Sequence, residues 1–421
     1  MDAIRKTNRV AIVTRTTANG GGANRVAEEL YLLLNNDSSL DVDFWIKHPT
    51  GETESKYKQL CGQSAKRLEQ LTRVSSNVLR APGIFELPFL RIARHWRSYD
   101  LIHFHDTSVT CSPASMRWLA RRVPVVWTMH DLSPLTGGCI YPMECTKYEG
   151  GCHHCPQLGK WPLSRIDSTA WTQAFKRKTA ASGLVQPIVP SRWLENEVAQ
   201  WGHYPFSPVR IPYSVNLERF KPRDKLELAK ELLSDDTQKF RILVSSYTLA
   251  EERKGFRFAI EAVRKLKRNV QLLILGNWDA SLAKSLDGID HRAVGFVNDR
   301  DLLAKYFALA DVYLFPSLAD NLPCSVMEAS ASGTPTVGFN VGGMPDLVQH
   351  NASGWLAEPR DIDGLALGLA KLIDSTSLRE AWSDAARNHA VQNYAPQDAV
   401  RAHLDLYQGV RAQWRRFRSQ C

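Results

Sequence analysis

Two acidic residues, Asp320 and Glu328, lie eight residues apart in the segment PSLADNLPCSVMEAS. The run that precedes them, residues 310–315 (ADVYLF), is short, apolar and rich in aromatic and β-branched side chains, which predicts a buried strand. The small residues 325–332 predict a short helix. The two carboxylates are therefore expected at either end of a loop that leads from a strand into a helix.

A second strand, expected over 336–339, leads into Gly342-Gly343 and a further helix start near Pro345. Backbone N–H groups at the two helix starts have no partner within their helices, and they should face the carboxyl ends of the strands, where open α/β sheets bind ligands. Such donors stabilise a diphosphate, whereas a carboxylate repels one. We expect Asp320 and Glu328 to accept hydrogen bonds from hydroxyl groups, one on a sugar and one on a ribose. The segment predicts a nucleotide-sugar site.

Two adjacent cations, Arg253 and Lys254, lie between predicted strands at 240–245 and 270–275. They stand where a helix is expected to begin, and positive charge there is unfavourable for the helix dipole. We expect an anion such as a diphosphate to offset them. The alternative is a solvated pair of charges.

Histidines follow two other predicted strands. His103 and His105 lie at the end of the strand expected over 100–104, and His130 follows the strand expected over 123–128. The imidazole of His130 should emerge at the carboxyl edge of the sheet, where it could donate to a sugar hydroxyl or carbonyl. A core histidine that pairs with a carboxylate is the alternative.

Three glycines, including Gly21 and Gly22, separate a strand expected over 9–14 from an amphipathic helix expected over 24–34. Glycines let the backbone approach a ligand and expose the helix N-terminus. A flexible loop is the alternative.

Four of the eight cysteines fall in a short segment with the spacing C-x5-C-x6-C-x2-C, and glycines flank them. The last pair has the spacing of a zinc knuckle. The segment is compatible with a structural tetrathiolate zinc site, with disulfides or with unliganded thiols. The proposed zinc ligands are Cys139, Cys145, Cys152 and Cys155.

The length of 421 residues exceeds what one core usually sustains, so we expect two domains, and the composition is that of a globular protein. No apolar run has the length of a membrane span, and the first residues lack a signal-peptide pattern, which favours a cytoplasmic enzyme. Residues 1–200 hold 25 basic and 18 acidic residues, an excess of seven within the total of +9.

Part of that basic excess lies in residues 71–97, where arginines alternate with apolar residues. This pattern could form a surface for peripheral contact with anionic lipid at the inner membrane face. The alternative is a helix pair with a solvated basic face. Nucleic acid is disfavoured as a partner because no recognition motif accompanies the charge.

Strand and helix signals alternate in both halves of the chain, which predicts parallel α/β sheets. The expected organisation is an N-terminal domain over 1–210 with a cysteine-rich insert at 137–158, a C-terminal domain over 211–395, and a final helix over 396–421. The segment IPYSVNLERFKP from Ile211 reads as the interdomain linker.

The acid pair with seven residues between its members, the following small-residue helix, G-T-P and Gly-Gly resemble the retaining glycosyltransferases of family 4. This resemblance implies the GT-B fold, in which two Rossmann-like domains face a central cleft and the C-terminal helix crosses back to the first domain. The chain departs from the family pattern in having Asp rather than Glu at 320. A cysteine insert of this kind resembles a subset from bacterial surface-polysaccharide assembly.

The resemblance also implies roles for residues and partners. The N-terminal domain would take a glycan or lipid-linked acceptor, and the C-terminal domain would bind a nucleoside-diphosphate sugar, with no metal or other cofactor in catalysis. The expected catalytic residues are His130, Arg253, Lys254 and Asp320, and the expected donor-binding residues are Gly21, Gly22, Asn321, Leu322 and Glu328.

We therefore expect a retaining, nucleotide-sugar-dependent hexosyltransferase of polysaccharide biosynthesis. A nucleotide-sugar epimerase on the same fold is the first alternative, and it would turn over donor without acceptor. A non-catalytic sugar-nucleotide-binding subunit is the second.

Overall fold

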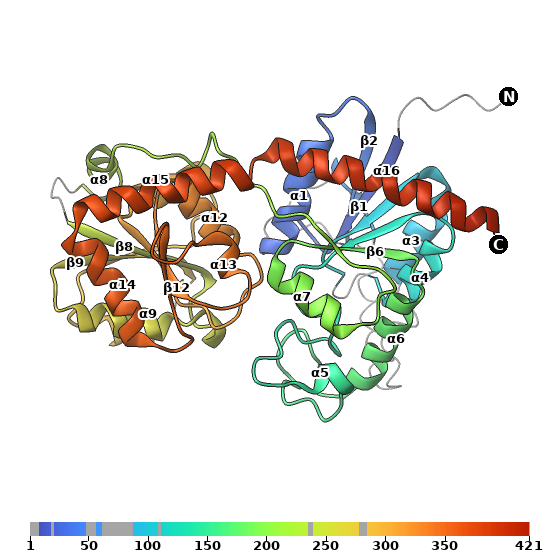
Figure 1. Ribbon diagram of the computed structural model, residues 1–421, viewed down its shortest axis with the longest axis horizontal. Coiled ribbons are helices and arrows are strands. Elements are labelled where there is room, and N and C mark those ends of the chain that lie inside the picture. Colours follow the sequence, from blue (N-terminus) through green and yellow to red (C-terminus); the bar gives the residue numbers. More distant parts are fainter. Residues whose placement is uncertain are drawn as a thin grey trace. The chain divides into compact units, whose positions relative to one another are not determined.

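The computed structural model describes residues 8–17, 21–47, 56–60, 87–107, 111–234, 239–277 and 284–420, and these form two compact units (Figure 1). The first unit consists of Met1–Ile211 together with Gln397–Cys421, and the second consists of Pro212–Pro396. Each unit is built on one parallel β-sheet, as the alternation of strand and helix signals predicts.

The first sheet has seven strands in the order β3-β2-β1-β4-β5-β6-β7. The strand order reverses between β1 and β4, which makes the carboxyl ends of these two strands the topological switch point. The strands are β1 (Asn8–Thr14), β2 (Leu40–Ile46), β3 (Lys58–Gln59), β4 (Leu101–Phe104), β5 (Val125–Thr128), β6 (Val185–Val189) and β7 (Val209–Arg210). The helices are α1 (Gly22–Leu34), α3 (Leu87–His95), η4 (Trp96–Ser98), α4 (Pro113–Ala120), α5 (Lys147–Gly150), α6 (Thr169–Ala181), α7 (Arg192–Trp201) and α16 (Pro396–Gln420).

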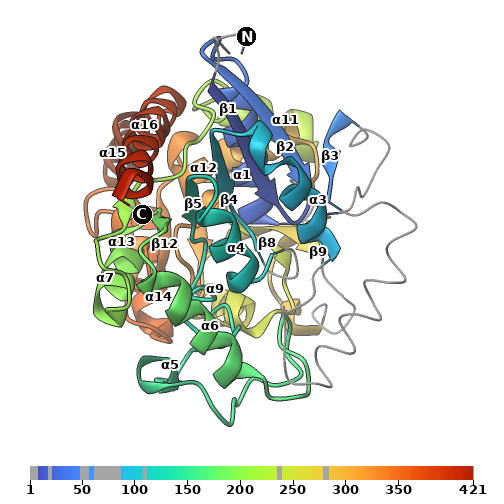
Figure 2. The same ribbon diagram turned by 90° about the vertical axis from the view of Figure 1, so that its right-hand side faces the viewer.

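Helices cover both faces of this sheet. Side chains of β1 point alternately to the two faces and enter a separate hydrophobic cluster on each. Val13 packs in a cluster with residues of α4 and α6, which lie on the near face in Figure 2. Ile12 packs in the other cluster, with residues of α1 and with Tyr407 of α16. The Tyr407 hydroxyl lies 2.7 Å from His103 Nδ1, and Trp414 Nε1 donates to the Ala120 carbonyl at 2.9 Å. The last helix is thus part of the first unit, which confirms the expectation that it crosses back.

The second sheet has six strands in the order β10-β9-β8-β11-β12-β13, with its switch point between β8 and β11. The strands are β8 (Phe240–Thr248), β9 (Val270–Asn277), β10 (His291–Gly295), β11 (Val312–Phe315), β12 (Thr336–Phe339) and β13 (Gly354–Ala357). The helical elements are α8 (Lys225–Leu233), η5 (Glu252–Lys254), α9 (Phe256–Leu266), η6 (Lys284–Leu286), α11 (Arg300–Leu309), α12 (Cys324–Ala331), α13 (Met344–Leu347), α14 (Ile362–Asp374) and α15 (Thr376–Asn393). A cluster around Ile242, Leu314 and Val337 forms one part of the core of this unit, and the alternate strand residues Leu243, Leu273 and Tyr313 are also fully buried.

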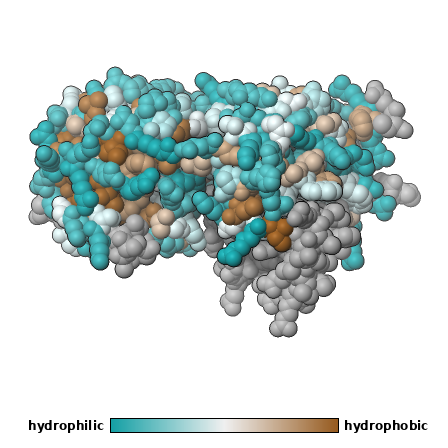
Figure 3. All heavy atoms as spheres, turned by 90° about the horizontal axis from the view of Figure 1, so that it is seen from below, coloured by the Kyte–Doolittle hydropathy of each residue, from teal (hydrophilic) through white to brown (hydrophobic). Residues whose placement is uncertain are grey.

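The surface seen in Figure 3 is mainly hydrophilic, with apolar side chains in small groups. Within the described ranges, no helix is long and apolar enough to span a membrane. Most of the basic surface predicted over 71–97 lies outside the described residues, which resume with α3. Peripheral membrane contact therefore stays a prediction.

Candidate functional site

The acidic and basic residues singled out in the second unit meet at its switch point. Arg253 and Lys254 belong to η5, which follows β8, and Asp320 lies in the loop that follows β11. Loops beyond the carboxyl ends of these two strands form the usual ligand crevice of an open parallel sheet. The chain topology therefore brings the predicted cations and the predicted acid together.

Backbone contacts hold these loops against each other. The Leu318 N–H donates to the Arg253 carbonyl at 2.8 Å, which ties the loop after β11 to η5. Gly255 adopts a φ of +71°, and a Cβ there would lie 2.0 Å from the Pro316 carbonyl oxygen. Gly342, in the loop after β12, has a φ of +53°, and a Cβ there would lie 1.8 Å from the Asp320 carbonyl oxygen. Any side chain at either glycine would push the loops apart.

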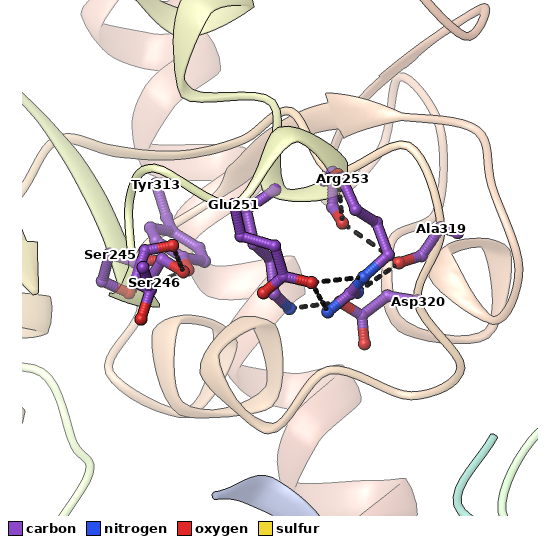
Figure 4. A network of polar contacts seen from close by, with 10 residues as sticks. Ser245, Ser246, Glu251, Arg253, Tyr313, Ala319 and Asp320 are labelled. Atoms are coloured by element: carbon purple, nitrogen blue, oxygen red, sulfur yellow. Dashed lines mark hydrogen bonds and ion pairs between the residues drawn. The ribbon is translucent and has the colours of Figure 1, made fainter. Parts of the chain in front are cut away.

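An ionic cluster lies at this junction, and Figure 4 shows most of its members. The carboxylate of Asp320 accepts from Lys254 Nζ at 2.7 Å and from Arg253 Nη1 at 3.3 Å. Arg253 Nη1 also donates to the Ala319 carbonyl at 2.7 Å, and its Nη2 lies 2.8 Å from Glu251 Oε1. The guanidinium group is therefore held on several sides, and two cations share two carboxylates.

The cluster is largely shielded from water. The side chains of Asp320, Arg253 and Lys254 are 14%, 17% and 23% exposed. Burial raises the pKa of Asp320, but the charges of Lys254 and Arg253 more than offset this effect and hold the pKa below its usual value. Asp320 is consequently ionised at neutral pH and fixes the position of both cations.

Glu328, one turn into α12, is almost fully buried and pairs with a residue that the sequence analysis did not single out. Its Oε1 accepts from Arg300 Nη2 at 2.7 Å. The Arg300 guanidinium lies 4.8 Å from the centre of the Phe220 ring, a distance suited to a cation–π contact. The predicted donor-binding residues Asn321 and Leu322 are both buried just before the start of α12. Arg300 begins α11, 28 residues before Glu328, so no local pattern in the sequence relates the two.

His103, His105 and His130 lie in a row at the carboxyl ends of β4 and β5, and the first two are buried. His105 Nδ1 lies 3.1 Å from His130 Nε2. His103 is fully buried between the hydroxyls of Thr128 and Tyr407, each at 2.7 Å. His103 therefore has a packing role in the described structure, whereas His130 is only partly buried at the strand end.

Burial lowers the pKa of His130 to about 4, although the nearby Asp106 acts in the opposite direction. The pKa values of His103 and His105 are also lowered by burial. At neutral pH each of these rings is uncharged and carries one N–H donor. His130 can then donate a hydrogen bond without adding a positive charge.

Asp106 and Asp131 also stand at this edge and were not predicted as site residues. Asp106 follows His105, forms an ion pair with Arg15 at 3.0 Å and accepts from Asn24 Nδ2 at 3.3 Å. Burial raises the pKa of Asp131 to about 6, while its Oδ1 accepts from the Ser133 N–H. The signal for both acids is present in the sequence, because each directly follows a histidine at a strand end.

Gly21 and Gly22 lie at the start of α1, with Gly21 in the N-cap position at a φ of +107°. A Cβ at either position would meet no atom within 4 Å. The backbone at this helix start is thus uncovered by the described side chains. This arrangement leaves room for a ligand beside Gly21 and Gly22. Their role in donor binding stays a prediction.

The cysteine segment differs from the expected zinc site. In the ranges that the structure covers, no group of three or more His, Cys, Asp or Glu side chains is arranged to hold a metal ion. The thiols are free, and α6 holds the segment instead: Gln173 Nε2 donates to the carbonyls of Leu135 and Tyr148, and its Oε1 accepts from the Cys152 N–H at 2.7 Å. The structure therefore does not support structural zinc at Cys139, Cys145, Cys152 and Cys155.

Comparisons with known proteins extend these observations. Residues 20–219 match the family described as Glycosyltransferase Family 4, and residues 224–389 match Glycosyl transferases group 1. An uncharacterized glycosyltransferase of Methanocaldococcus jannaschii is 26% identical over 323 residues, which are 73% of this chain and 75% of that protein. A putative colanic acid biosynthesis glycosyl transferase of Escherichia coli is 25% identical over 301 residues, 68% of this chain and 69% of the relative.

The fold has counterparts among solved structures. Anabaena HepE in complex with UDP-glucose superposes with a TM-score of 0.69 at 15% identity, covering 95% of this chain and 99% of that chain. At this identity the likeness shows the fold alone. The parallel Rossmann-like sheets, the C-terminal helix and the two glycosyltransferase family matches, which span residues 20–219 and 224–389, together identify the chain as a glycosyltransferase with the GT-B fold.

Proposed function

We propose that this glycosyltransferase moves a hexose from a nucleoside-diphosphate sugar to a glycan or lipid-linked acceptor, with retention of the anomeric configuration. The observation that carries the proposal is the cluster of Arg253, Lys254 and Asp320 at the switch point of the second sheet. Two fixed cations beside the starts of two helices provide the environment that a diphosphate requires.

In transfer, the bond between the anomeric carbon and the diphosphate oxygen breaks while the acceptor oxygen bonds to the same carbon. Negative charge grows on the leaving phosphate, and the sugar becomes cationic. Arg253 and Lys254 stabilise that phosphate, because they are held in place before the reaction and need little reorganisation. The departing phosphate takes the proton of the acceptor hydroxyl, so that the protein need not supply a general base.

The remaining residues position the two substrates. Glu328 accepts hydrogen bonds from the ribose hydroxyls, and its ion pair with Arg300 fixes the carboxylate. Asn321 and Leu322 line the start of α12 beside the donor. Asp320 orients Lys254 and accepts a hydroxyl of the transferred sugar.

In the first unit, neutral His130 donates to the sugar, and the open backbone at Gly21 and Gly22 admits diphosphate and acceptor. The UDP-glucose complex of HepE supports a nucleotide-sugar donor, and the colanic acid relative supports a role in polysaccharide biosynthesis. We place the enzyme in the cytoplasm, and the arginines that alternate with apolar residues over 71–97 support peripheral contact with anionic lipid at the inner face of the membrane.

The test is a panel of UDP-, GDP- and ADP-sugars, scored by the rise in melting temperature. The sugar that stabilises the protein is then supplied with candidate glycan acceptors, and the anomeric configuration of the product is read by NMR. We expect an acceptor-dependent product with the configuration of the donor. Donor turnover without acceptor would instead identify the epimerase, and binding without any turnover would identify the non-catalytic subunit.

Lys254→Ala tests the assigned site and should weaken donor binding. Lys265→Ala is the matched control, because Lys265 lies on α9 in a surface ion pair with Asp363. Loss of donor binding in both variants, or in neither, contradicts the assignment of the diphosphate to Lys254.

A further inference from the structure

The segment between α5 and α6 carries an unusually exposed tryptophan. Trp161 is 60% exposed. Trp171, on α6, is 58% exposed, so exposure alone does not distinguish the two. Their surroundings do, because only Trp161 of this pair stands beside charged groups at the strand ends of the first sheet.

Trp161 occupies a turn that is braced on both sides. The Leu163 N–H donates to the Lys160 carbonyl at 2.8 Å, and the Gly159 N–H donates to the Ser164 carbonyl at 3.0 Å. Leu163 packs against Gly138, where a Cβ would lie 2.8 Å from Leu163 Cδ2. These contacts fix the backbone that presents the indole.

The indole reaches the switch point of the first sheet. The Arg15 guanidinium carbon lies 5.4 Å from the centre of the Trp161 ring, within the range of a cation–π contact. Arg15 directly follows β1, and its Nε lies 3.0 Å from Oδ2 of Asp106, which is two residues beyond β4. Asn24 Nδ2 lies 3.3 Å from the same carboxylate. An aromatic face, a carboxylate, an amide and a guanidinium are thus gathered at one edge.

This combination matches the chemistry of a hexopyranose. The ring carbons of a hexose expose C–H bonds on its faces, and these pack on an aromatic face, while the hydroxyls around the ring need hydrogen-bond donors and acceptors. A large apolar side chain held in water beside such polar groups is typical of a binding site. A purely polar ligand would make no use of the indole face, and a purely apolar ligand would form no hydrogen bond with the Asp106 carboxylate or the Arg15 guanidinium.

We propose that Trp161 is a stacking platform for a hexose ring of the acceptor substrate, and that Arg15 and Asp106 form the polar part of the same subsite, with the buried Asn24 holding the Asp106 carboxylate in place. The inference rests on the proposed function, in which the first unit takes the acceptor. It assigns acceptor recognition to the turn that directly follows the cysteine-rich insert at 137–158, a role that needs no metal.

The test uses the full chain labelled with 5-fluorotryptophan and observed by fluorine NMR. The chain has 12 tryptophans, and the resonance that disappears in Trp161→Phe belongs to Trp161. The probes are the methyl glycosides of glucose, galactose, mannose and N-acetylglucosamine, with glycerol as the polar control. We expect at least one glycoside to shift the Trp161 resonance saturably, with no shift from glycerol and none at the Trp171 resonance.

Activity supplies the second readout. With the glycoside or oligosaccharide that serves as acceptor, Trp161→Ala should raise the acceptor KM about five- to tenfold, the cost of one lost aromatic contact, and Trp171→Ala should not. The donor-induced rise in melting temperature should be the same in both variants. Trp161→Phe should recover part of the loss, because a smaller aromatic face remains.

The outcomes separate the two proposals. A protein that binds nucleotide sugar but shows no glycoside-induced shift at Trp161, or equal shifts at Trp161 and Trp171, overturns the platform and leaves the proposed function intact. A saturable shift at Trp161 in a protein that binds no nucleotide sugar overturns the proposed function and leaves a carbohydrate site.

Discussion

Replacing Asp320 by Asn removes one negative charge from the ionic cluster and nearly preserves the side-chain volume. The carboxylate lies 2.7 Å from Lys254 Nζ and 3.3 Å from Arg253 Nη1. In the variant, these two cations face Glu251 as their one remaining carboxylate within the cluster. We expect Asp320→Asn to be less stable than the wild type without ligand, and to gain more from a bound diphosphate.

The magnitude follows from the distances. At an effective dielectric constant of about 20, the two charge pairs attract by about 6 and about 5 kcal/mol before desolvation is counted. The three side chains are only 14–23% exposed, so desolvation offsets most of this attraction. The Asn oxygen also keeps one hydrogen bond to Lys254. The net loss in the free energy of unfolding should be about 2–3 kcal/mol.

Urea unfolding measures the loss, and thermal shifts with UDP, GDP and ADP measure the gain from ligand. The control is Asp301→Asn, which removes an exposed partner of Arg219 and should cost at most about 0.5 kcal/mol. We expect the nucleoside diphosphate that binds the wild type to raise the melting temperature of Asp320→Asn by a larger amount. Equal stability of the two variants, or an equal ligand shift in Asp320→Asn and wild type, would refute the reasoning.

Three further predictions concern the sites in both units. Lys254→Ala should slow transfer about ten- to several-hundredfold in a folded protein, because it removes a charge-assisted contact to the leaving phosphate, and steady-state kinetics measures the change. Glu328→Gln should weaken nucleoside diphosphate and nucleotide sugar alike in titration calorimetry, since the ribose is common to both; a loss confined to the sugar-bearing ligand contradicts this. The free energy of unfolding should fall as the pH drops from about 6.5 to about 4, because His130 and the buried His403 of α16 have folded pKa values of about 4 and the unfolded state takes up protons first. Asp131, with a pKa of about 6, acts in the opposite sense, because its folded carboxyl takes up a proton before the unfolded one does. Urea unfolding at each pH measures the free energy of unfolding, and its dependence on pH should be weaker in His130→Gln.

Much of the fold could be read from the sequence, because buried parallel strands are continuous apolar runs. The seven strands predicted above are all present, between β1 and β12. The strand β2 was missed because Asp41 and Asp43 interrupt its apolar run. In the structure the Asp43 carboxylate accepts from Arg9 Nη2 at 2.9 Å, Lys58 Nζ at 2.7 Å and the Tyr99 hydroxyl at 2.7 Å. Because these partners are distant in the sequence, no local pattern indicates that Asp43 can be accommodated in a strand.

The candidate site was predictable to the extent that its residues follow strands. Lys254, Asp320 and His130 lie in segments that follow strands, and the topology of parallel sheets then fixes the edge at which they lie. The pairing of Asp320 with both cations was not predictable, since it depends on which loops meet at the switch point. The cysteine spacing suggested a metal site. It carries no information about the hydrogen bonds that Gln173 accepts from the Cys152 N–H and donates to the Leu135 carbonyl, which hold the segment.

The return of α16 to the first unit has a consequence for the order of folding. The hydrogen bonds between His103 and Tyr407 and between Trp414 and Ala120 join residues 304 and 294 positions apart, and Tyr407 fills part of the core around Ile12. The second unit is one continuous segment, so its contacts are all available before α16 is synthesised. During translation the first unit is the first to be synthesised but the last to be completed. One face of its core cannot form fully until α16 has left the ribosome.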